Sequence, residues 1–520
     1  MQRTDNSREM EYNRQSDKVR SGILITATGS GCGKTTFVCG LLWLLKRRGL
    51  RPCAFKCGPD YIDPSFHRRV LGVPSYNLDP FFTEDKVLRQ LYEVHSRENN
   101  NHNISVIEGV MGYYDGLGFT DEASSYSVAR TLDVPVILMV DCKGMGHSVM
   151  PVVEGFVRHR TPSMIQGVVF NRMAPSLYEK AAEEVRALGI IPLGYLPENR
   201  DLHLESRHLG LVMADEIQDF TQKIEDIANR MEETVDVDGI LQLAQSGGGV
   251  LSEQNIKPAP EKVSGQQVQG SVYLPYSSEE PMEKEGNSAV RIAVARDEAF
   301  CFLYEDNLNF LRAHGAEIVP FSPLHDKTIP ADCDALYLSG GYPELYAGEL
   351  SENRSMRQDI KTQIERGLPC IAECGGFLYL HEQMESREEA GVNGKRMAAE
   401  ELQCFQEMVG IIPAKAVNHR RKGHFGYIEV TLEKDCLLGE KGDSLRAHEF
   451  HYWESDMRQA DLHVYKPGNG SIWTEGLCTE TLYAGFPHLY FYGSPKAGER
   501  FLAAAGRYQE KTDKKGNNFL

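Results

Sequence analysis

Long apolar runs are missing from this chain of 520 residues. The first twenty residues, MQRTDNSREMEYNRQSDKVR, are polar throughout and lack the apolar stretch of a signal peptide. No later run approaches the roughly 18 apolar residues that a membrane span needs. We therefore expect a protein that is neither secreted nor embedded in a membrane and that works in the cytoplasm.

Positive charge is also scarce. The chain has 56 Lys and Arg against 74 Asp and Glu, a formal net charge of -18. This excess of negative charge disfavours nucleic acid and anionic membrane surfaces as partners. We expect small-molecule substrates, with no nucleic acid and no membrane, and a homodimer is left open as the assembly.

The cysteines show no disulfide or zinc-finger framework. Twelve are scattered along the chain, and the closely spaced pairs Cys53/Cys57 and Cys370/Cys374 have neither a second pair nor histidines at zinc-finger spacing. We expect most of them to be buried, inert thiols.

What the chain does have is two series of short β-rich runs that alternate with helical stretches. GILITAT, PCAFK, ISVIEG, VPVILMV and IQGVVFN form the first series, and VRIAVAR, GAEIVPF, DALYLSGG and LPCIAEC the second. Fully apolar strands separated by helices predict parallel sheets covered on both faces, the α/β class. The predicted parts are a polar tail (1–20), an α/β domain (21–232), a low-complexity linker (233–288), a second α/β domain (289–508) and a polar tail (509–520).

The first domain opens with a phosphate-binding pattern. In ILITATGSGCGKTT, the glycines at 29, 31 and 33 follow a strand and precede a helix, so backbone amides can converge on a phosphate at the helix N-terminus. A lysine supplies charge, and a threonine hydroxyl can ligate magnesium. The alternative without a function in binding is a glycine turn that serves only the fold. The residues predicted to bind ATP are Gly31, Gly33, Lys34, Thr35 and Thr36.

Further polar residues follow the next strands. FKCGPDYIDPSFH supplies Lys56, Asp60 and Asp63, and VIEG supplies Glu108. Carboxylates at strand ends suit Mg²⁺ and phosphoryl transfer, and lysine offsets the gathered negative charge. Capping of turns beside prolines is an equally good explanation of both aspartates. Asn171, after VVF, either reads adenine through its amide or is a turn residue.

The second domain carries one thiol in an unusual setting. Cys374 lies between a strand and two glycines, the arrangement of a nucleophile elbow. Gly340 and Gly341 follow another strand and can turn their amides toward an oxyanion, and His488 is a candidate base. A buried inert thiol is the alternative. These residues together predict nucleophilic catalysis.

RAHEFHYWES packs His448, Glu449 and His451 into four positions. Such a group can bind metal, but strand alternation puts His448 and Glu449 on opposite faces. We therefore favour substrate-side or structural roles for this cluster over metal ligation.

Taken together, the motifs resemble the cobyrinic acid a,c-diamide synthase family over nearly the whole chain. The matching stretches are GSGCGKTT, FKCGPDYIDPSFH, VIEGVMGYYDG, SRHLGL, VARDEAFCFLYEDNLNFL, FSPLHD, LSGGYPEL, AECGGFLYL and HEFHYWES. The resemblance implies a P-loop NTPase domain like dethiobiotin synthetase, followed by a class I glutamine amidotransferase domain. It also implies a ligase that uses ATP, Mg²⁺ and glutamine to amidate the a and c acetate side chains of cobyrinic acid.

Residue roles follow from the same resemblance. Cys374 would attack the glutamine amide, and His488 would activate the thiol and protonate the leaving amine. In the P-loop domain, the resemblance implies that phosphates are bound by Lys34 and Lys56. It implies that magnesium is bound by Thr35 and Glu108. The phosphorylation site would include Asp60 and Asp63.

The sequence leaves three points open. Many class I amidotransferases place Glu two residues after the histidine to orient it, whereas this chain has Tyr490, so the third triad member is unassigned. Nickel-sirohydrochlorin and hydrogenobyrinic acid are alternative substrates for the same architecture. A P-loop switch protein with an inactive amidotransferase-like domain is the alternative from another class; it should carry a lysine where Gly29 stands and should lack the thiol of Cys374.

Overall fold

The computed structural model describes residues 21–97, 103–198, 217–246, 289–386, 404–418 and 423–516. The chain divides into two compact units. Unit 1 comprises Met1–Pro80 and Leu88–Leu274, and unit 2 comprises Phe81–Val87 and Pro275–Leu520.

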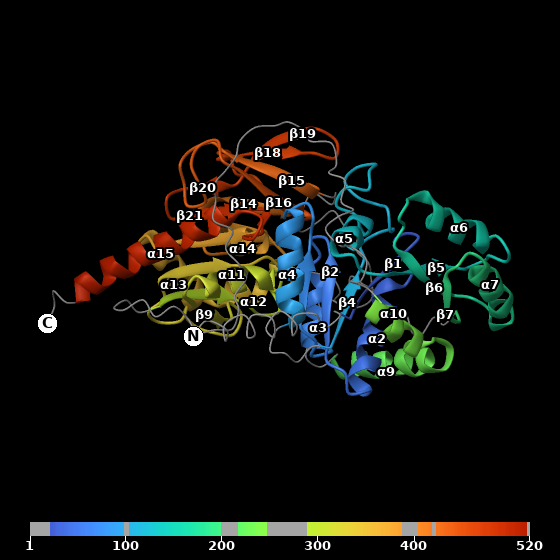
Figure 1. The fold of residues 1–520 in the computed structure, drawn as a ribbon. Helices are drawn as coiled ribbons and strands as arrows, with labels where there is room; N and C mark the ends of the chain where they lie inside the picture. Colours follow the sequence, from blue (N-terminus) through green and yellow to red (C-terminus); the bar gives the residue numbers. More distant parts are fainter. Residues whose placement is uncertain are drawn as a thin grey trace, which may run out of the picture. The chain divides into compact units, whose positions relative to one another are not determined.

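Unit 1 is built on a seven-stranded parallel sheet of order β3-β2-β4-β1-β5-β6-β7 (Figure 1). The neighbours of β1 in the sheet are β4 and β5, which come later in the chain, as expected for crossover connections through helices. The predicted parallel sheet is confirmed. Its strands are β1 (Gly22–Ala27), β2 (Pro52–Cys57), β3 (Ser75–Leu78), β4 (Ile104–Glu108), β5 (Val136–Asp141), β6 (Ile165–Asn171) and β7 (Ile191–Leu196).

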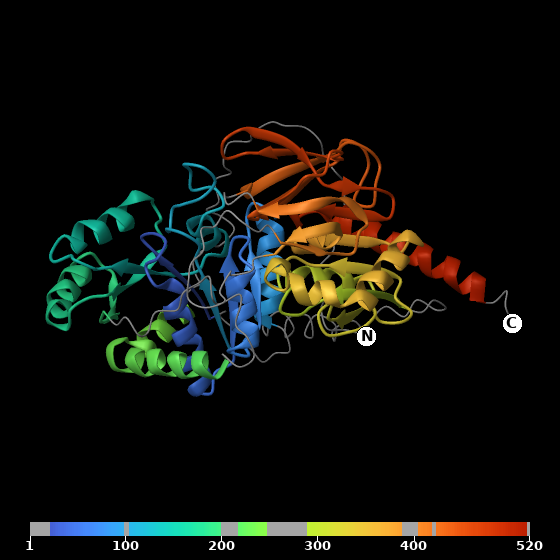
Figure 2. The same cartoon turned by 180° about the vertical axis from the view of Figure 1, so that it is seen from behind.

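Helices cover both faces of this sheet. Along β1, Ile23 and Ile25 pack on one face and Leu24 on the other, which is why the strand is apolar throughout. The first face is covered by α2 (Lys34–Arg47), α3 (Ile62–Arg69), α9 (Ile217–Thr234) and α10 (Val237–Ser246), and Figures 1 and 2 show α9 and α10 beside α2. The second face is covered by α4 (Asp85–Arg97), α5 (Ser125–Leu132), α6 (Val149–His159) and α7 (Pro175–Ala187).

Two predicted boundaries differ from the structure. The predicted linker starts at residue 233, but α10 lies inside it and buries Val237, Ile240 and Leu243 in the core of unit 1. Their helical spacing outweighs the polar residues between them. The predicted C-terminal tail, 509–520, is helical to Gly516 because α15 (Pro495–Gly516) continues into it. The predicted tail 1–20 and the rest of the predicted linker, 247–288, lie outside the described residues.

Unit 2 is built on a six-stranded sheet of order β20-β21-β11-β10-β8-β9. All neighbours are parallel except β20 and β21, which are antiparallel. The four predicted runs of the second series lie in β8 to β11. The strands are β8 (Val290–Ala295), β9 (Ala316–Phe321), β10 (Ala335–Leu338), β11 (Cys370–Glu373), β20 (Leu477–Cys478) and β21 (Leu482–Gly485).

Two further sheets complete unit 2, and neither was predicted from the sequence. The four-stranded sheet has the order β13-β12-β14-β17, and the five-stranded antiparallel sheet has the order β19-β18-β15-β16-β22. The first contains β12 (His381–Glu385), β13 (Phe405–Glu407), β14 (Ile412–Asn418) and β17 (Trp453–Ser455). The second contains β15 (Phe425–Leu432), β16 (Ser444–Phe450), β18 (Leu462–Lys466), β19 (Ser471–Glu475) and β22 (His488–Leu489). The helical segments of unit 2 are α11 (Glu305–Ala313), η2 (Pro343–Leu345), α12 (Ala347–Glu352), α13 (Arg354–Glu365), α14 (Gly375–Tyr379) and α15.

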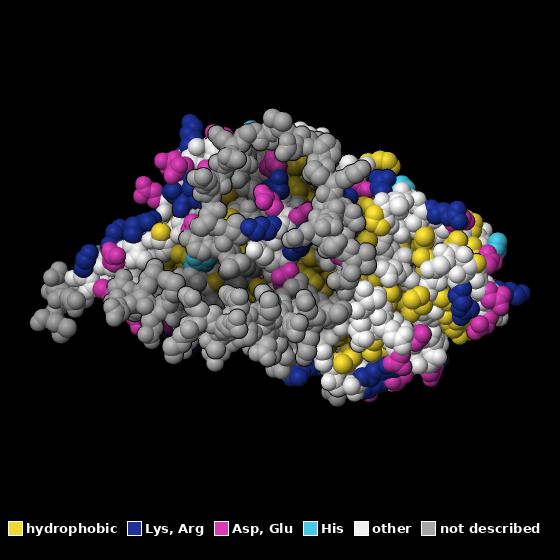
Figure 3. All heavy atoms as spheres, in the orientation of Figure 1, with side chains coloured by type: hydrophobic (Ala, Val, Ile, Leu, Met, Phe, Trp, Pro, Cys, Tyr) yellow, Lys and Arg dark blue, Asp and Glu magenta, His cyan; other side chains and the backbone are white. Residues whose placement is uncertain are grey.

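Exposed charges of both signs are mixed on the surface of unit 1. Figure 3 shows Lys and Arg interspersed with Asp and Glu over the part that holds α6 and α7. Arg158 and Glu154 form one such exposed pair, at 3.0 Å, and pairs of this kind contribute at most about 1 kcal/mol. Among the described helices, none combines the length and the apolar character needed to cross a bilayer.

A buried histidine should make the stability of unit 2 sensitive to acid. The ring of His381 is fully buried, with Nδ1 2.9 Å from the carbonyl of Phe377 and Nε2 2.7 Å from the hydroxyl of Ser455. Burial lowers the pKa of His381 to about 4, from an ordinary 6.5. Between these values the unfolded chain binds the proton and the folded protein does not. The free energy of unfolding should therefore fall, by up to about 3 kcal/mol, as pH falls from 6.5 to 4.

The variant His381→Gln isolates this contribution. Denaturant unfolding at pH 7 and at pH 4.5 should show a smaller loss of stability for the variant than for the wild type. His67 and His448, which burial also holds neutral, are present in both proteins and cancel in the comparison. An equal loss in the two proteins would show that His381 does not carry the acid sensitivity assigned to it.

Candidate functional site

The glycine-rich loop joins β1 to α2 in unit 1. Gly31 and Gly33 have φ angles of 74° and 88°, a left-handed conformation that side chains rarely adopt. A Cβ atom at Gly33 would also lie 2.5 Å from Nδ2 of Asn171. Both conformation and space therefore require glycine at position 33, the N-cap of α2.

Lys34 begins α2 and turns back over the loop. Its Nζ donates to the carbonyl of Gly29 at 2.9 Å and to the carbonyl of Met111 at 2.5 Å. Burial, and then the nearby charge of Lys56, lower the pKa of Lys34. Thr36 is half-buried in the first turn of the same helix. A buried cation held against the loop by carbonyl groups is well placed to meet a phosphate at the helix N-terminus.

A compact polar group lies beside this loop, at the carboxyl ends of β2 and β4. The Thr35 hydroxyl donates to Oε1 of Glu108 at 2.7 Å and lies 3.4 Å from Oδ2 of Asp63. Lys56 Nζ donates to the same two carboxylates, at 2.8 Å to Glu108 and 2.5 Å to Asp63. The structure thus brings together four of the residues that the sequence predicted to be functional.

Burial and mutual charge shift the pKa values within this group. Burial, assisted by the charge of Asp63, raises the pKa of Glu108 to about 7. Burial also acts to lower the pKa of Lys56, but Asp63, Glu108 and Asp60 outweigh it and hold that pKa well above its usual value. Burial, followed by the charge of Asp63, raises the pKa of Asp60 to about 6. Lys56 is therefore a fixed cation among carboxyl groups.

Two oxygens of this group lack hydrogen-bond partners within the described ranges. They are Oε2 of Glu108 and Oδ1 of Asp63, and both residues are at least 97% buried. Buried oxygens normally have a partner. With the hydroxyl of Thr35 they form a set of hard oxygen donors, which suits a divalent cation such as Mg²⁺.

Asp60 makes the turn contacts that the capping alternative predicted, whereas Asn171 contacts the phosphate loop. Oδ1 of Asp60 accepts from the backbone amides of Ile62 at 2.8 Å and Asp63 at 3.3 Å, so it closes the turn that leads into α3. Nδ2 of Asn171 donates to the carbonyl of Cys32 at 2.8 Å, within the phosphate loop. Their roles in phosphorylation and adenine binding remain predictions. The stretch SRHLGL, 206–211, lies outside the described residues.

In unit 2, Cys374 occupies the sharp turn between β11 and α14. Its φ and ψ are 47° and -101°, a strained conformation for a residue with a side chain. The next two glycines allow the turn, because a Cβ at Gly376 would lie 2.2 Å from the carbonyl oxygen of Leu338. The thiol lies 3.8 Å from the carbonyl of Phe450, and burial raises its pKa. This geometry is that of a nucleophile elbow whose thiol needs a base.

Gly340, Gly341 and His488 surround the elbow. A Cβ at Gly340 would lie 2.4 Å from Cε1 of His488, and a Cβ at Gly375 would lie 2.9 Å from the backbone nitrogen of Gly341. The glycines therefore let the histidine ring and a backbone amide approach the turn that holds Cys374. The structure brings all four predicted residues of this site into one neighbourhood.

Glu373 is a residue that our sequence reasoning missed. Its Oε2 lies 3.7 Å from Nδ1 of His488, and both side chains are buried. The backbone amide of Leu489 donates to its Oε1 at 2.9 Å, and the hydroxyl of Tyr337 donates to its Oε2 at 3.0 Å. The available signal was a charged residue that ends the otherwise apolar strand PCIAE, directly before the thiol.

Tyr490, two residues after His488, does not face the histidine as a triad acid would. Its hydroxyl donates to Oδ2 of Asp306 at 2.9 Å. The side chains of the HEFHYWES cluster do not all meet at one place. His448 pairs with His488 in the β16–β22 ladder, whereas Glu449 and His451 approach Glu475.

Comparison with known protein families assigns both units. The family of the CobQ/CobB/MinD/ParA nucleotide binding domain matches residues 23–212, and the CobB/CobQ-like glutamine amidotransferase domain matches residues 291–496. Among solved structures, MinD of Aquifex aeolicus (TM-score 0.28, 16% identity) covers 41% of this chain and 97% of its own. PurLQS of Thermotoga maritima (TM-score 0.29, 16% identity) covers 42% and 99%.

Two relatives that match nearly the whole chain carry the same name. The cobyrinate a,c-diamide synthase of Listeria monocytogenes serotype 4b (strain F2365) is 38% identical over 480 residues, which cover 90% of this chain and 96% of that protein. The cobyrinate a,c-diamide synthase of Salmonella typhimurium (strain LT2) is 37% identical and covers 93% and 98%. Sequence identity at this level, over nearly the whole length of both aligned chains, shows that the chain belongs to the cobyrinate a,c-diamide synthase family.

Proposed function

We propose that the chain amidates the a and c acetate side chains of cobyrinic acid, with unit 1 activating the carboxylate by ATP and unit 2 releasing ammonia from glutamine. The observation that carries this proposal is the pair of separate sites. One unit holds Lys34, Thr35 and Glu108 around a phosphate loop, and the other holds Cys374 and His488 around a nucleophile elbow.

In unit 2, the sulfur of Cys374 attacks the glutamine side-chain amide while His488 takes the thiol proton. The same proton then goes to the leaving nitrogen, so ammonia departs and a thioester remains. Backbone amides at Gly340 and Gly341 stabilise the oxyanion. Water, deprotonated by His488, cleaves the thioester to glutamate and restores the thiol.

In unit 1, Lys34 and Lys56 hold the phosphates of ATP, and Asp60 and Asp63 serve the phosphorylation site. Thr35 and Glu108 would hold Mg²⁺, which when bound offsets the negative charge of the transferred phosphoryl group. The substrate carboxylate oxygen takes the γ-phosphate and ADP leaves. Ammonia then attacks the acyl carbon, phosphate leaves with the carboxyl oxygen, and an amide forms.

The identity of the macrocycle rests on the names of the relatives rather than on a described contact. The test is amide formation, measured by mass spectrometry with Mg-ATP, glutamine and one of three substrates. We expect cobyrinic acid to gain two amides. Two amides on nickel-sirohydrochlorin or hydrogenobyrinic acid, with none on cobyrinic acid, would keep the architecture and overturn the substrate.

We also propose that Glu373 is the positioning residue of the amidotransferase triad. Its carboxylate faces Nδ1 of His488 and is held from two other sides, so it fixes the ring and stabilises the imidazolium that forms when Cys374 loses its proton. It would take the role that the glutamate after the histidine has in many class I enzymes.

Replacing Glu373 by Gln should lower kcat for glutamine hydrolysis by about 10²–10³-fold, because the size is kept and the charge is lost. KM for glutamine should change little, and ammonia-dependent amidation should be retained. The matched control is Tyr490→Phe, which should leave kcat within about threefold. A fully active E373Q together with an inactive Y490F would assign the role to position 490 instead.

A further inference from the structure

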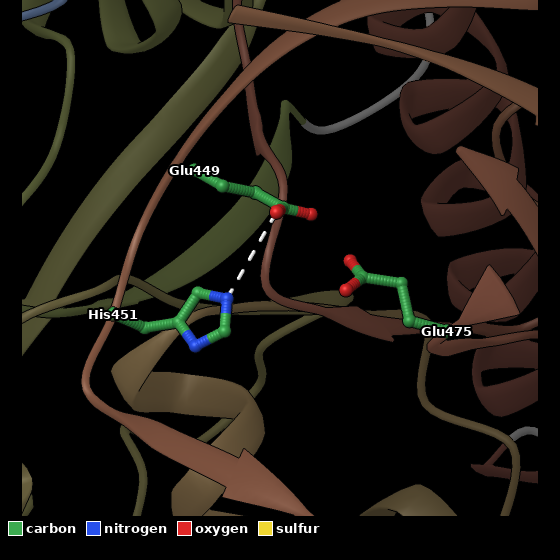
Figure 4. Close-up of side chains that lie close together, drawn as sticks. All are labelled: Glu449, His451 and Glu475. Carbon is green, nitrogen blue, oxygen red and sulfur yellow. Dashed lines mark ion pairs between the residues drawn. The ribbon is translucent and has the colours of Figure 1, made fainter. Parts of the chain in front are cut away.

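Three polar side chains of unit 2 converge away from the residues assigned to catalysis. Glu449 lies near the end of β16, His451 just follows that strand, and Glu475 ends β19. One potential ligand atom from each lies within 4.8 Å of those of the other two. Figure 4 shows the two carboxylates and the imidazole directed toward one another.

Glu449 is buried and Glu475 is half-buried, and few hydrogen bonds compensate their carboxyl groups. Glu449 is 0% exposed, and neither of its oxygens accepts from an N–H group or a hydroxyl of the described residues; its carboxyl group meets the carboxyl group of Glu475, with which it can share a proton. Oε1 of Glu475 likewise accepts from no such group, whereas its Oε2 accepts from Nε1 of Trp473 at 3.2 Å. Burying two adjacent negative charges is costly unless protons or a cation neutralise them.

His451 is oriented as a metal ligand would be. Its Nδ1 lies 2.7 Å from the carbonyl of Trp453 and must donate, because a carbonyl only accepts. Nε2 then carries the lone pair of the neutral ring, is buried without a described hydrogen-bond partner, and lies 3.9 Å from Oε2 of Glu449. A histidine that donates one ring nitrogen to a carbonyl and offers the other is the usual arrangement around a metal.

We propose that Glu449, His451 and Glu475 bind a divalent transition-metal ion, for which Zn²⁺ is the best fit. Two carboxylates match the charge of the ion, and an imidazole nitrogen favours Zn²⁺ over Mg²⁺ or Ca²⁺. Zinc bonds of about 2.0–2.2 Å need donor atoms closer together than 4.8 Å, so the side chains close on the ion by about 1 Å.

The ion would tie the end of β16 to the end of β19. Phe450 lies between two of the ligands in sequence, and its carbonyl is the group 3.8 Å from the thiol of Cys374. The site would therefore hold in place part of the wall around the nucleophile. Its role is positional, because none of its three residues is assigned to the reacting atoms.

Metal content is the direct test. The full chain, purified without chelator and freed of loose metal, should contain about one zinc per chain by elemental analysis. E475Q and H451Q should lose most of it. H448Q, which alters an equally buried histidine that pairs with His488 instead, should keep it. Zinc that survives in both E475Q and H451Q is bound elsewhere and would overturn the proposal.

A second readout needs no variant. Two of the three tryptophans, Trp453 and Trp473, hydrogen-bond to this cluster. Adding Zn²⁺ to metal-free wild type should change the intrinsic fluorescence and raise the melting temperature, and Mg²⁺, which belongs to the site in unit 1, should not reproduce the fluorescence change. Metal-free protein as isolated, without a response to Zn²⁺, would show that the carboxyl groups are neutralised by protons.

Discussion

Replacing Cys374 by Ala should abolish glutamine hydrolysis, with a fall in kcat of at least about 10⁴-fold, because no other group can form the thioester. Amidation driven by high concentrations of ammonia should continue at close to the wild-type rate. The reason is that activation of the carboxylate depends on unit 1, whose phosphate loop and carboxylates the substitution does not alter. Glutaminase activity and ammonia-dependent amidation are measured on the same preparation.

Cys370→Ala is the matched control for this prediction. Cys370 is the first residue of β11, the strand that leads to the elbow. It is fully buried, and burial raises its pKa, but it does not lie at the turn. Its removal should cost stability and leave glutamine use within a few-fold of wild type. Glutamine hydrolysis that persists in C374A would contradict the assignment of the nucleophile. Loss of the ammonia-dependent reaction as well would contradict the division of labour between the units.

Replacing Lys34 by Met should have the reverse pattern. ATP hydrolysis and ammonia-dependent amidation should fall by about 10²–10³-fold, since the side chain keeps its length but loses the charge that meets the phosphates. Glutamine hydrolysis measured without ATP should remain. The variant thus carries its own folding control, because glutaminase activity reports on the intact chain.

Lys46→Met tests whether any lysine of this helix would give the same result. Lys46 lies in the last turn of α2, and its Nζ donates to the carbonyl of Leu71, away from the loop. We expect K46M to keep ATP-dependent amidation near the wild-type rate. Full activity of K34M would show that the loop does not bind the reacting phosphates through this lysine.

The sequence was informative wherever function depends on local pattern. The glycine loop before α2 and the thiol turn after β11 each combine a strand, a glycine requirement and a helix start within a few residues. The apolar runs identified the central strands of the seven-stranded sheet of unit 1 and of the six-stranded sheet of unit 2. The antiparallel strands of unit 2 were missed for two different reasons. In β15 the alternation is present, since Ile428, Val430 and Leu432 are buried between half-buried residues, but our prediction relied on fully apolar runs and did not use it. The strand β19 is short and largely exposed, so it has no clear alternation.

The residues missed at the sites depend on contacts between distant segments. Glu373 becomes a candidate only when β11 lies beside the chain that leads to His488, 115 positions later. Glu475 meets Glu449 only through the folding of the five-stranded sheet. The spacing of residues in the sequence predicts neither the contact of Glu373 with His488 nor that of Glu475 with Glu449. Strand register and chain crossovers decide which of these side chains meet in the folded protein.

The central claim is that one chain couples glutamine hydrolysis to ATP-driven amidation of cobyrinic acid. The most direct measurement supplies glutamine with an isotopically labelled amide nitrogen, together with Mg-ATP and cobyrinic acid, and follows label, ADP and glutamate together. We predict two labelled nitrogens in each product molecule, with at least one ADP and one glutamate formed for each nitrogen transferred. Glutamate and ADP formed without label in the macrocycle would contradict the account.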